Sequence, residues 1–209
     1  MSTPWVATRR VTDAPTRVFH WLLVLCFFGA YLTSESERLQ QFHAAFGYGM
    51  VALLAFRLLY GWVGPRPVRW TSLATRLRSG WAWWRSLQCL RDVFGQGARA
   101  GQNFVLVLIT SGLMLLPAPL LLSGHVLYVG TAEWLEEVHE LLANAMWMLV
   151  FAHLGLLLVL SVLRGTNLAL PMWRGRVVGA GPDLIAHSRA WLALALLVGT
   201  SVFGVWAVL

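Results

Sequence analysis

Residues 139–163 read HELLANAMWMLVFAHLGLLLVLSVL, and this stretch decides the fold. It exceeds the ~20 mostly apolar residues that a helix needs to cross a ~30 Å hydrocarbon core. It also carries His139 and His153, which are fourteen residues apart. At about 100° per residue, fourteen residues rotate to within about 40° of four full turns, so both rings lie on one face of the helix. At 1.5 Å per residue they are separated by about 21 Å along the helix axis, which places them near opposite sides of a bilayer. An ionisable side chain is costly in hydrocarbon, so metal or cofactor ligation is the first shared function to consider.

The composition predicts an all-α integral membrane protein. Of the 209 residues, 58% are hydrophobic and 12% are charged, whereas soluble domains typically carry about 25% charged residues. We predict a single membrane domain over residues 1–209, built as a bundle of membrane-spanning helices. Five spans are expected, at about 17–33, 43–62, 103–122, 140–163 and 189–209. Pro117 and Pro119 are expected to break the third span early, and the fifth could instead be a peripheral or partner-contacting helix.

The charges predict the orientation of the chain in the membrane. All sixteen cationic residues are arginines, and a strongly basic chain would suggest nucleic-acid binding if its positions were ignored. Most precede the first span (Arg9, Arg10, Arg17), separate the second and third (Arg66, Arg69, Arg76, Arg78, Arg85, Arg91, Arg99) or separate the fourth and fifth (Arg164, Arg174, Arg176, Arg189). The alternate loops carry Glu35 and Glu37 with Arg38, then Glu133, Glu136, Glu137 and Glu140. The positive-inside rule therefore places the amino terminus in the cytoplasm and the carboxyl terminus on the outer side, with lipid and not nucleic acid as the neighbour.

The long inner loop, residues 64–101, has surface character. Within it, residues of about 72–91 alternate leucine and tryptophan with arginine at helical spacing, which predicts an amphipathic helix in the cytoplasmic headgroups. Simple membrane anchoring is favoured there over a specific site. Cys26 and Cys89 lie too far apart to pair, and no C-x-x-C-H motif exists for covalent haem attachment, so any haem is held by coordination alone.

Four histidines form two predicted pairs. His20 lies a turn inside the cytoplasmic end of the first span, and His43 opens the second span from outside. Because neighbouring spans run antiparallel, His43 and His139 fall at the outer level, and His20 and His153 fall in the inner half. Each pair could give both axial nitrogens to one haem iron, and the two sites would stack across the bilayer.

The remaining histidines and small residues are less informative. His125 in the outer loop and His187 in the inner loop lack the depth to join a pair. For a single histidine such as His43, the alternative is a ring satisfied by a backbone carbonyl at a helix end. Glycines at helical positions could leave room beside a macrocycle or simply let helices approach, and both interpretations stay open; they are Gly29, Gly47, Gly49 and Gly155.

Arg57 is the remaining candidate for cofactor binding. It follows His43 by fourteen residues, so it shares that stripe of the second span but lies near the inner site. A guanidinium in hydrocarbon needs a countercharge, and a haem propionate can accept bidentate hydrogen bonds from it. The alternative is an arginine whose side chain reaches the inner interface.

Several stretches resemble one family. Residues 13–21 read DAPTRVFHW, His43 is followed by Gly47 and Tyr48, residues 56–61 read FRLLYG, and residues 164–172 read RGTNLALPM. In combination they resemble the bacterial cytochrome b561 family, which also holds the cytochrome b subunits of nickel–iron hydrogenases, over roughly residues 11–175. The resemblance implies four haem-binding helices carrying two haems b, with His20, His43, His139 and His153 as ligands, and electron exchange with a quinone and a partner. The fifth span is extra to the minimal four-span members.

We therefore predict a dihaem cytochrome b that passes single electrons across the inner membrane. Quinol such as ubiquinol would be the donor and a periplasmic redox protein, for example a c-type cytochrome, the acceptor. Such a chain could act as a quinone-linked oxidoreductase, and no catalytic residue is assigned. One alternative within the family is a superoxide oxidase that reduces ubiquinone, although an acidic outer surface suits an anion poorly. From another class, a metal-ion transporter or channel would need polar, broken helices near the midplane, and these spans are apolar.

Overall fold

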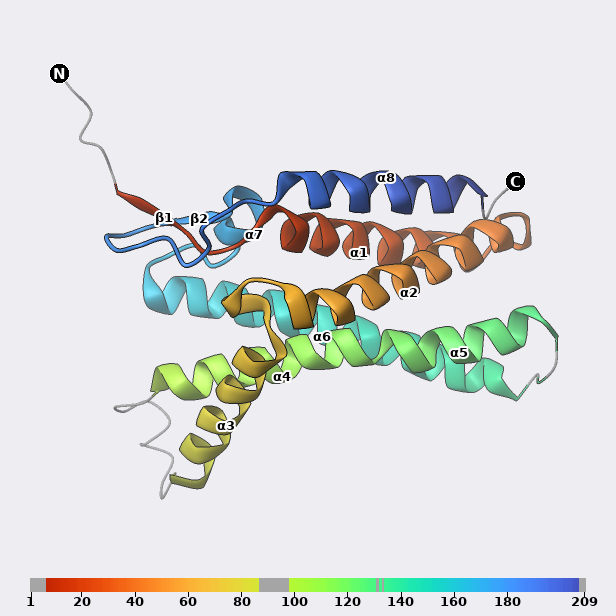
Figure 1. Ribbon diagram of the computed structural model, residues 1–209. Helices are drawn as coiled ribbons and strands as arrows, with labels where there is room; N and C mark the ends of the chain where they lie inside the picture. Colours follow the sequence, from red (N-terminus) through yellow and green to blue (C-terminus); the bar gives the residue numbers. More distant parts are fainter. Residues whose placement is uncertain (1–6, 87–97, 131, 133, 207–209) are drawn as a thin grey trace. The chain divides into compact units, whose positions relative to one another are not determined.

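The computed structural model describes residues 7–86, 98–130, 132 and 134–206. It is all-α apart from one short pair of strands, as predicted for a helical membrane bundle (Figure 1). The chain divides into two compact units. The first unit combines Met1–Pro67 with Ala169–Leu209, and the second is Val68–Leu168.

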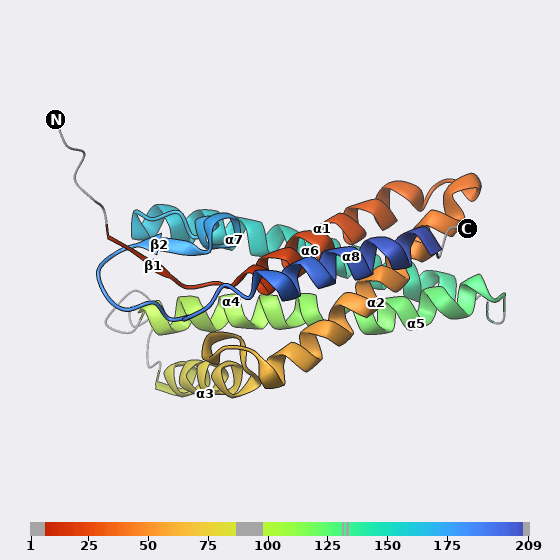
Figure 2. The ribbon, with the colours of Figure 1, turned by 45° about the horizontal axis from the view of Figure 1, so that its top comes forward.

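Three long helices make up most of the first unit. Helix α1 (Ala14–Thr33) starts at the N-cap Asp13, and a 3-10 turn, η1 (Glu37–Leu39), leads into α2 (Gln40–Val63), which runs back along α1. Helix α8 (Ala190–Trp206) packs on both α1 and α2 (Figures 1 and 2). Short elements complete the unit: η2 (Arg66–Val68), α7 (Leu170–Arg174), β1 (Thr8–Arg10) and β2 (Arg176–Val178).

Small residues on α1 and α2 let these two helices approach closely. A Cβ atom added to Gly29 would lie 2.6 Å from the ring of Phe46, and one added to Gly49 would lie 3.2 Å from Cys26 Sγ. Both glycines therefore serve contact between helices, as small residues do in membrane proteins. Nothing lies within 4 Å of the Cβ position of Gly155.

A buried polar cluster joins the start of α1, the end of α2 and the start of α8. Asp13 is 0% exposed; its Oδ1 accepts a hydrogen bond from the Thr16 amide and its Oδ2 accepts one from the Tyr60 hydroxyl. Arg189 Nη1 in turn donates to the Tyr60 oxygen at 3.2 Å. These bonds compensate the carboxylate for its lost hydration.

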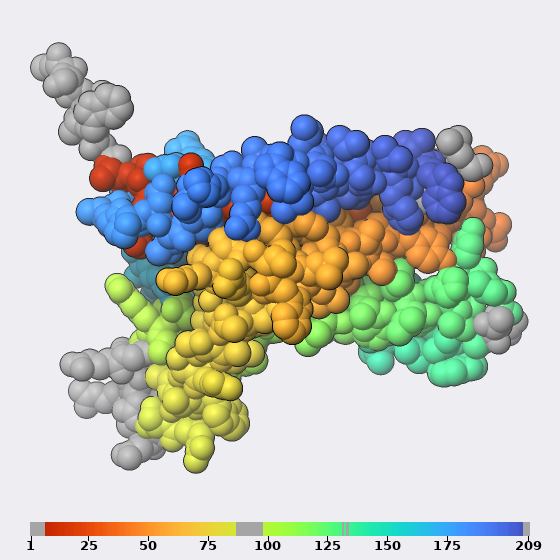
Figure 3. Space-filling view, viewed as in Figure 1, coloured from red at the N-terminus to blue at the C-terminus, as the bar shows by residue number. Residues whose placement is uncertain are grey.

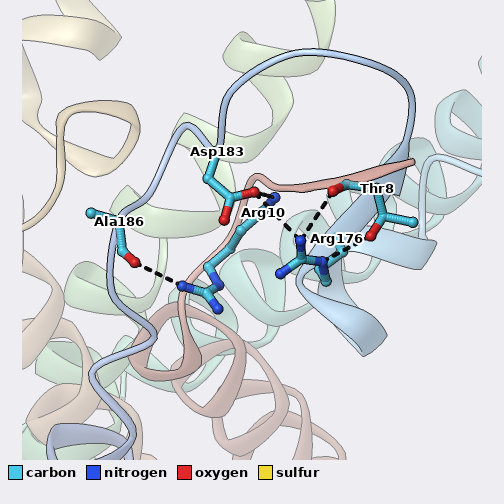
Figure 4. Close-up of polar contacts among 5 residues, drawn as sticks. All are labelled: Thr8, Arg10, Arg176, Asp183 and Ala186. Atoms are coloured by element: carbon cyan, nitrogen blue, oxygen red, sulfur yellow. Dashed lines mark hydrogen bonds and ion pairs between the residues drawn. The ribbon is translucent and has the colours of Figure 1, made fainter.

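A second polar network fastens the amino-terminal strand to the segment before α8 (Figure 4). Strands β1 and β2 pair antiparallel, with Arg9 opposite Val177. The Arg10 amide donates to Asp183 at 2.5 Å and its guanidinium donates to the Ala186 carbonyl at 2.9 Å. Arg176 adds two hydrogen bonds to Thr8 and an ion pair with Asp183 at 3.6 Å. Nothing in the local sequence predicts this pairing, because its partners are about 170 residues apart.

The second unit contains α3 (Trp70–Ser86), α4 (Ala98–Leu115), α5 (Pro117–Tyr128) and α6 (Leu135–Arg164). The helix is interrupted where Pro117 and Pro119 were expected to break the third span, because α4 ends at Leu115 and α5 begins at Pro117. The apolar stretch nevertheless continues to Tyr128, past the expected end of the span near residue 122. Hydrogen bonds from the Leu116 amide to the Gly112 carbonyl (2.9 Å) and from the Leu120 amide to the Leu116 carbonyl (3.2 Å) bridge the interruption. Proline is favoured in the first turn of a helix such as α5, where its missing N–H matters least.

Four helical stretches are long and apolar enough to cross a membrane: 14–33, 37–63, 98–128 and 135–164. Helix α8 is a shorter apolar helix of 17 residues, about 25 Å long. Its exposed face, visible in Figure 3, carries Trp191, Leu194, Val198, Val202 and Trp206, as a lipid-facing helix would. The predicted amphipathic segment of about 72–91 overlaps α3, where Trp81 and Trp84 are exposed, and its last five residues lie outside the described residues.

Candidate functional site

The four predicted ligand histidines all lie on long helices and are all half-buried. His20 is on α1, His43 on α2, and His139 and His153 are both on α6. Because α6 is continuous from Leu135 to Arg164, its two rings do share one helical face. His20 and His43 belong to the first unit, and His139 and His153 belong to the second.

The two histidines left out of the pairs are exposed. His187 lies in an irregular segment before α8, as predicted. The placement of His125 in a loop is wrong, because it lies in the last turn of α5. A second helix, α5, starts at Pro117 and extends to Tyr128, so it includes His125.

His43 is oriented by a backbone carbonyl. Its Nδ1 lies 2.8 Å from the Ala30 oxygen on α1. A carbonyl oxygen only accepts, so the ring must donate from Nδ1, and in the neutral ring Nε2 then keeps its lone pair. The carbonyl contact that serves as the alternative to ligation is thus present, and it engages Nδ1.

His139 is oriented by a side chain on α5. Its Nδ1 lies 3.0 Å from Ser123 Oγ, and the Ser123 hydroxyl donates to the Leu120 carbonyl at 3.0 Å. The ring also lies against Gly124, where an added Cβ would be 2.8 Å from His139 Cε1. Sequence reasoning missed Ser123 and Gly124, because a serine and a glycine in an apolar helix are too common to indicate a site.

His153 differs from these two. Its Nδ1 is buried and has no hydrogen-bond partner among the described residues. A buried polar nitrogen without a partner costs free energy. The ring therefore suits a group that is absent from the protein chain itself, such as a cofactor.

Near His20, the start of α1 contacts Met172 and Trp173, which lie at the other end of the stretch that resembles a known family. The neighbouring Trp21 donates from Nε1 to the Met172 carbonyl at 3.2 Å and its ring lies 4.2 Å from that of Trp173. Arg17 donates to the Trp173 carbonyl at 2.8 Å. Residues 13–21 and 164–172 are thus linked around the first turns of α1.

Arg57 is half-buried on α2, fourteen residues after His43 and one turn before Tyr60. The Asp13 carboxylate is close enough to act on the Arg57 guanidinium electrostatically. Arg57 therefore has a countercharge inside the first unit, which sequence reasoning did not foresee.

The donor set favours haem over a bare metal ion. Among the described residues, no three His, Cys, Asp or Glu side chains form a group that could hold a metal ion. Haem iron brings four porphyrin nitrogens and needs only two axial ligands. Imidazoles that are oriented by a contact at Nδ1, as in His43 and His139, fit that need.

Comparison with known proteins gives one match. The family model described as prokaryotic cytochrome b561 matches residues 11–175. This stretch contains the four predicted ligand histidines and Arg57, and it ends before α8. No curated protein and no solved structure matches the chain.

Proposed function

The chain belongs to the prokaryotic cytochrome b561 family, and we propose that it is a dihaem cytochrome that carries electrons across the inner membrane between the quinone pool and a periplasmic redox partner. Family membership makes it a multi-pass membrane cytochrome of electron transfer that binds haem b. The number of haems, the quinone and the partner are part of the proposal.

The proposed ligand pairs are His20 with His153 and His43 with His139. The observation that carries this assignment is the hydrogen bonding of His43 and His139, because each ring is held at Nδ1, the nitrogen that a ligand bound to iron through Nε2 uses for a second contact. The Nδ1 of His153, which is buried without a hydrogen-bond partner among the described residues, supports the second pair. Haem iron stores and releases single electrons when bound, while the chain sets axial ligation, spacing and dielectric.

We further propose that Arg57 binds a propionate of the haem held by His20 and His153. Its position on α2 supports this role, since it lies fourteen residues, about 21 Å, from His43 along the helix. The guanidinium of Arg57 can offer its fork of donors to a propionate carboxylate.

The proposed orientation has the amino terminus in the cytoplasm and the carboxyl terminus in the periplasm. Quinol would give up its electrons to this protein, which would reduce a soluble c-type cytochrome on the periplasmic side. Exposed carboxylates support that partner, because a basic protein would be steered toward them; they are Glu35, Glu37, Glu136, Glu137 and Glu140.

The ligand pairs are tested by removing one histidine. In the purified full-length protein, His153→Ala should lower the haem content from two haems per chain to one, because the iron held with His20 loses an axial ligand. The measurement is haem b per chain by pyridine haemochrome, together with a redox titration of the remaining absorption.

The matched control is His125→Ala, which removes an exposed histidine outside both pairs. It should keep two haems with unchanged midpoint potentials. Two haems in His153→Ala at the wild-type potentials would refute the pairing, and a wild-type protein with one haem per chain would refute the dihaem assignment itself.

A further inference from the structure

Ser123 is a buried polar residue whose side chain contacts a proposed haem ligand on another helix. It lies on α5, is 5% exposed, and holds its Oγ 3.0 Å from His139 Nδ1 on α6. Its second contact, to the Leu120 carbonyl, is within α5. A bond from Ser123 to Leu120 alone would satisfy the hydroxyl, so the approach to His139 needs its own account.

Iron ligation through Nε2 would set the direction of the bond between Ser123 and His139. A ring that binds iron through Nε2 carries its proton on Nδ1, so it donates to Ser123 Oγ. The hydroxyl then keeps its own proton for the Leu120 carbonyl. Neutral imidazole has one N–H, and Nε2 therefore presents a lone pair.

From this geometry we infer that Ser123 is a positioning residue for His139: it accepts from Nδ1–H, which makes Nε2 the nitrogen that binds iron, and so lowers the midpoint potential of that haem. The inference rests on the proposed function. An acceptor on the outer N–H of a ligating histidine makes the ring a stronger donor. A stronger donor stabilises ferric iron more than ferrous iron, which lowers the potential.

Two further contacts support the inference. Gly124, next to Ser123, leaves no space for a Cβ beside the His139 ring, so α5 fixes the position of the ring as well as its tautomer. His43, the other member of the proposed pair, has the same arrangement with the Ala30 carbonyl as the acceptor. Both ligands of one iron would then have an oxygen atom on Nδ1.

The test compares three variants of the full-length, haem-loaded protein by redox titration. Ser123→Ala removes the acceptor and should raise one of the two midpoint potentials, with the reduction equilibrium of that haem shifting about tenfold, or about 59 mV for one electron. Ser123→Thr keeps the hydroxyl and should stay near the wild-type value. Ser111→Ala is the matched control, because Ser111 Oγ on α4 is buried without a hydrogen-bond partner among the described residues, and it should shift neither potential.

Unchanged potentials in Ser123→Ala, or an equal shift in Ser123→Ala and Ser123→Thr, would overturn the inference. Loss of one haem in Ser123→Ala with retention in Ser123→Thr would support it. His139→Ala separates the inference from the proposed function, since it should lose one haem. If His139→Ala keeps both haems, the proposed pairing fails; if it loses one haem while Ser123→Ala keeps both potentials, only the role of Ser123 fails.

Discussion

The hydroxyl of Tyr60 satisfies a carboxylate that has no contact with solvent. Tyr60→Phe would leave Asp13 Oδ2 buried with one donor fewer, and an unsatisfied buried acceptor typically costs about 1–3 kcal/mol. The variant should therefore unfold at a lower temperature, by about 2–4 °C for each kcal/mol in a chain of this size. Circular dichroism of the detergent-solubilised protein during heating measures the change.

The control for this change is Tyr128→Phe, which removes the hydroxyl of a tyrosine that is 50% exposed. Its unfolding temperature should match that of the wild type. Equal unfolding temperatures for Tyr60→Phe and the wild type would show that the cluster around Asp13 does not stabilise the protein.

Among single residues, the sequence predicts the ones that are chemically unusual for their surroundings. His139 and His153 are conspicuous because ionisable groups are rare in apolar spans. Ser123, Gly124 and the Ala30 carbonyl could not be predicted, since serine, glycine and backbone groups are ordinary there. Their importance depends on how α5 meets α6 and how α1 meets α2, and a single sequence does not contain that register.

Helix α6 ends at a glycine that adopts a left-handed backbone conformation. Gly165 has φ +60°, and the Thr166 amide donates back to the Ser161 carbonyl at 3.1 Å. A Cβ in this conformation costs roughly 1–2 kcal/mol, so Gly165→Ala should destabilise the carboxyl end of α6 by about that amount. The expected result is a lower unfolding temperature with two haems still bound.

Gly204→Ala on α8 is the comparison for the change at the end of α6. Gly204 lies within a helix and nothing is within 4 Å of its Cβ position, so the variant should unfold at the wild-type temperature or above it. A Gly165→Ala protein as stable as Gly204→Ala would contradict the strain at this helix end.

At the scale of helices, apolar length predicts much of the fold, and proline predicts part of the rest. The four long stretches follow from hydropathy alone. Pro117 marks the point where α4 has ended and α5 begins, but a proline at the start of a helical segment needs no donor behind it, so α5 continues to Tyr128. The strands β1 and β2 could not be predicted, because three-residue strands carry no periodic signal.

At the scale of the whole molecule, opposite charges separate into alternate loops. Glu136 and Glu137 are exposed in the first turn of α6, where the helix dipole favours negative charge. If a basic c-type cytochrome docks there, the double variant Glu136→Gln/Glu137→Gln should slow its reduction several-fold at low salt, and less at high salt. Stopped-flow mixing of the quinol-reduced protein with a basic c-type cytochrome gives the rates.

Arg38→Gln supplies the opposite control. It removes an exposed positive charge from the first acidic loop, so reduction of the basic acceptor should become faster at low salt. If the reduction rate of the basic acceptor changes neither in the Glu136/Glu137 variant nor in Arg38→Gln, docking at these positions and the proposed direction of electron flow would both be contradicted.

The pairing of residues 8–10 with residues 176–178 also implies an order in which the two units complete their folding during translation. The first helical hairpin is synthesised early, yet its tether to Asp183 and its contact with Arg189 require the last fifth of the chain. The second unit, being one unbroken stretch, can mature before then. We therefore expect α1 and α2 to lack these contacts until translation is nearly complete. A chain truncated near residue 168 would never form them, and we expect membrane proteases to degrade it.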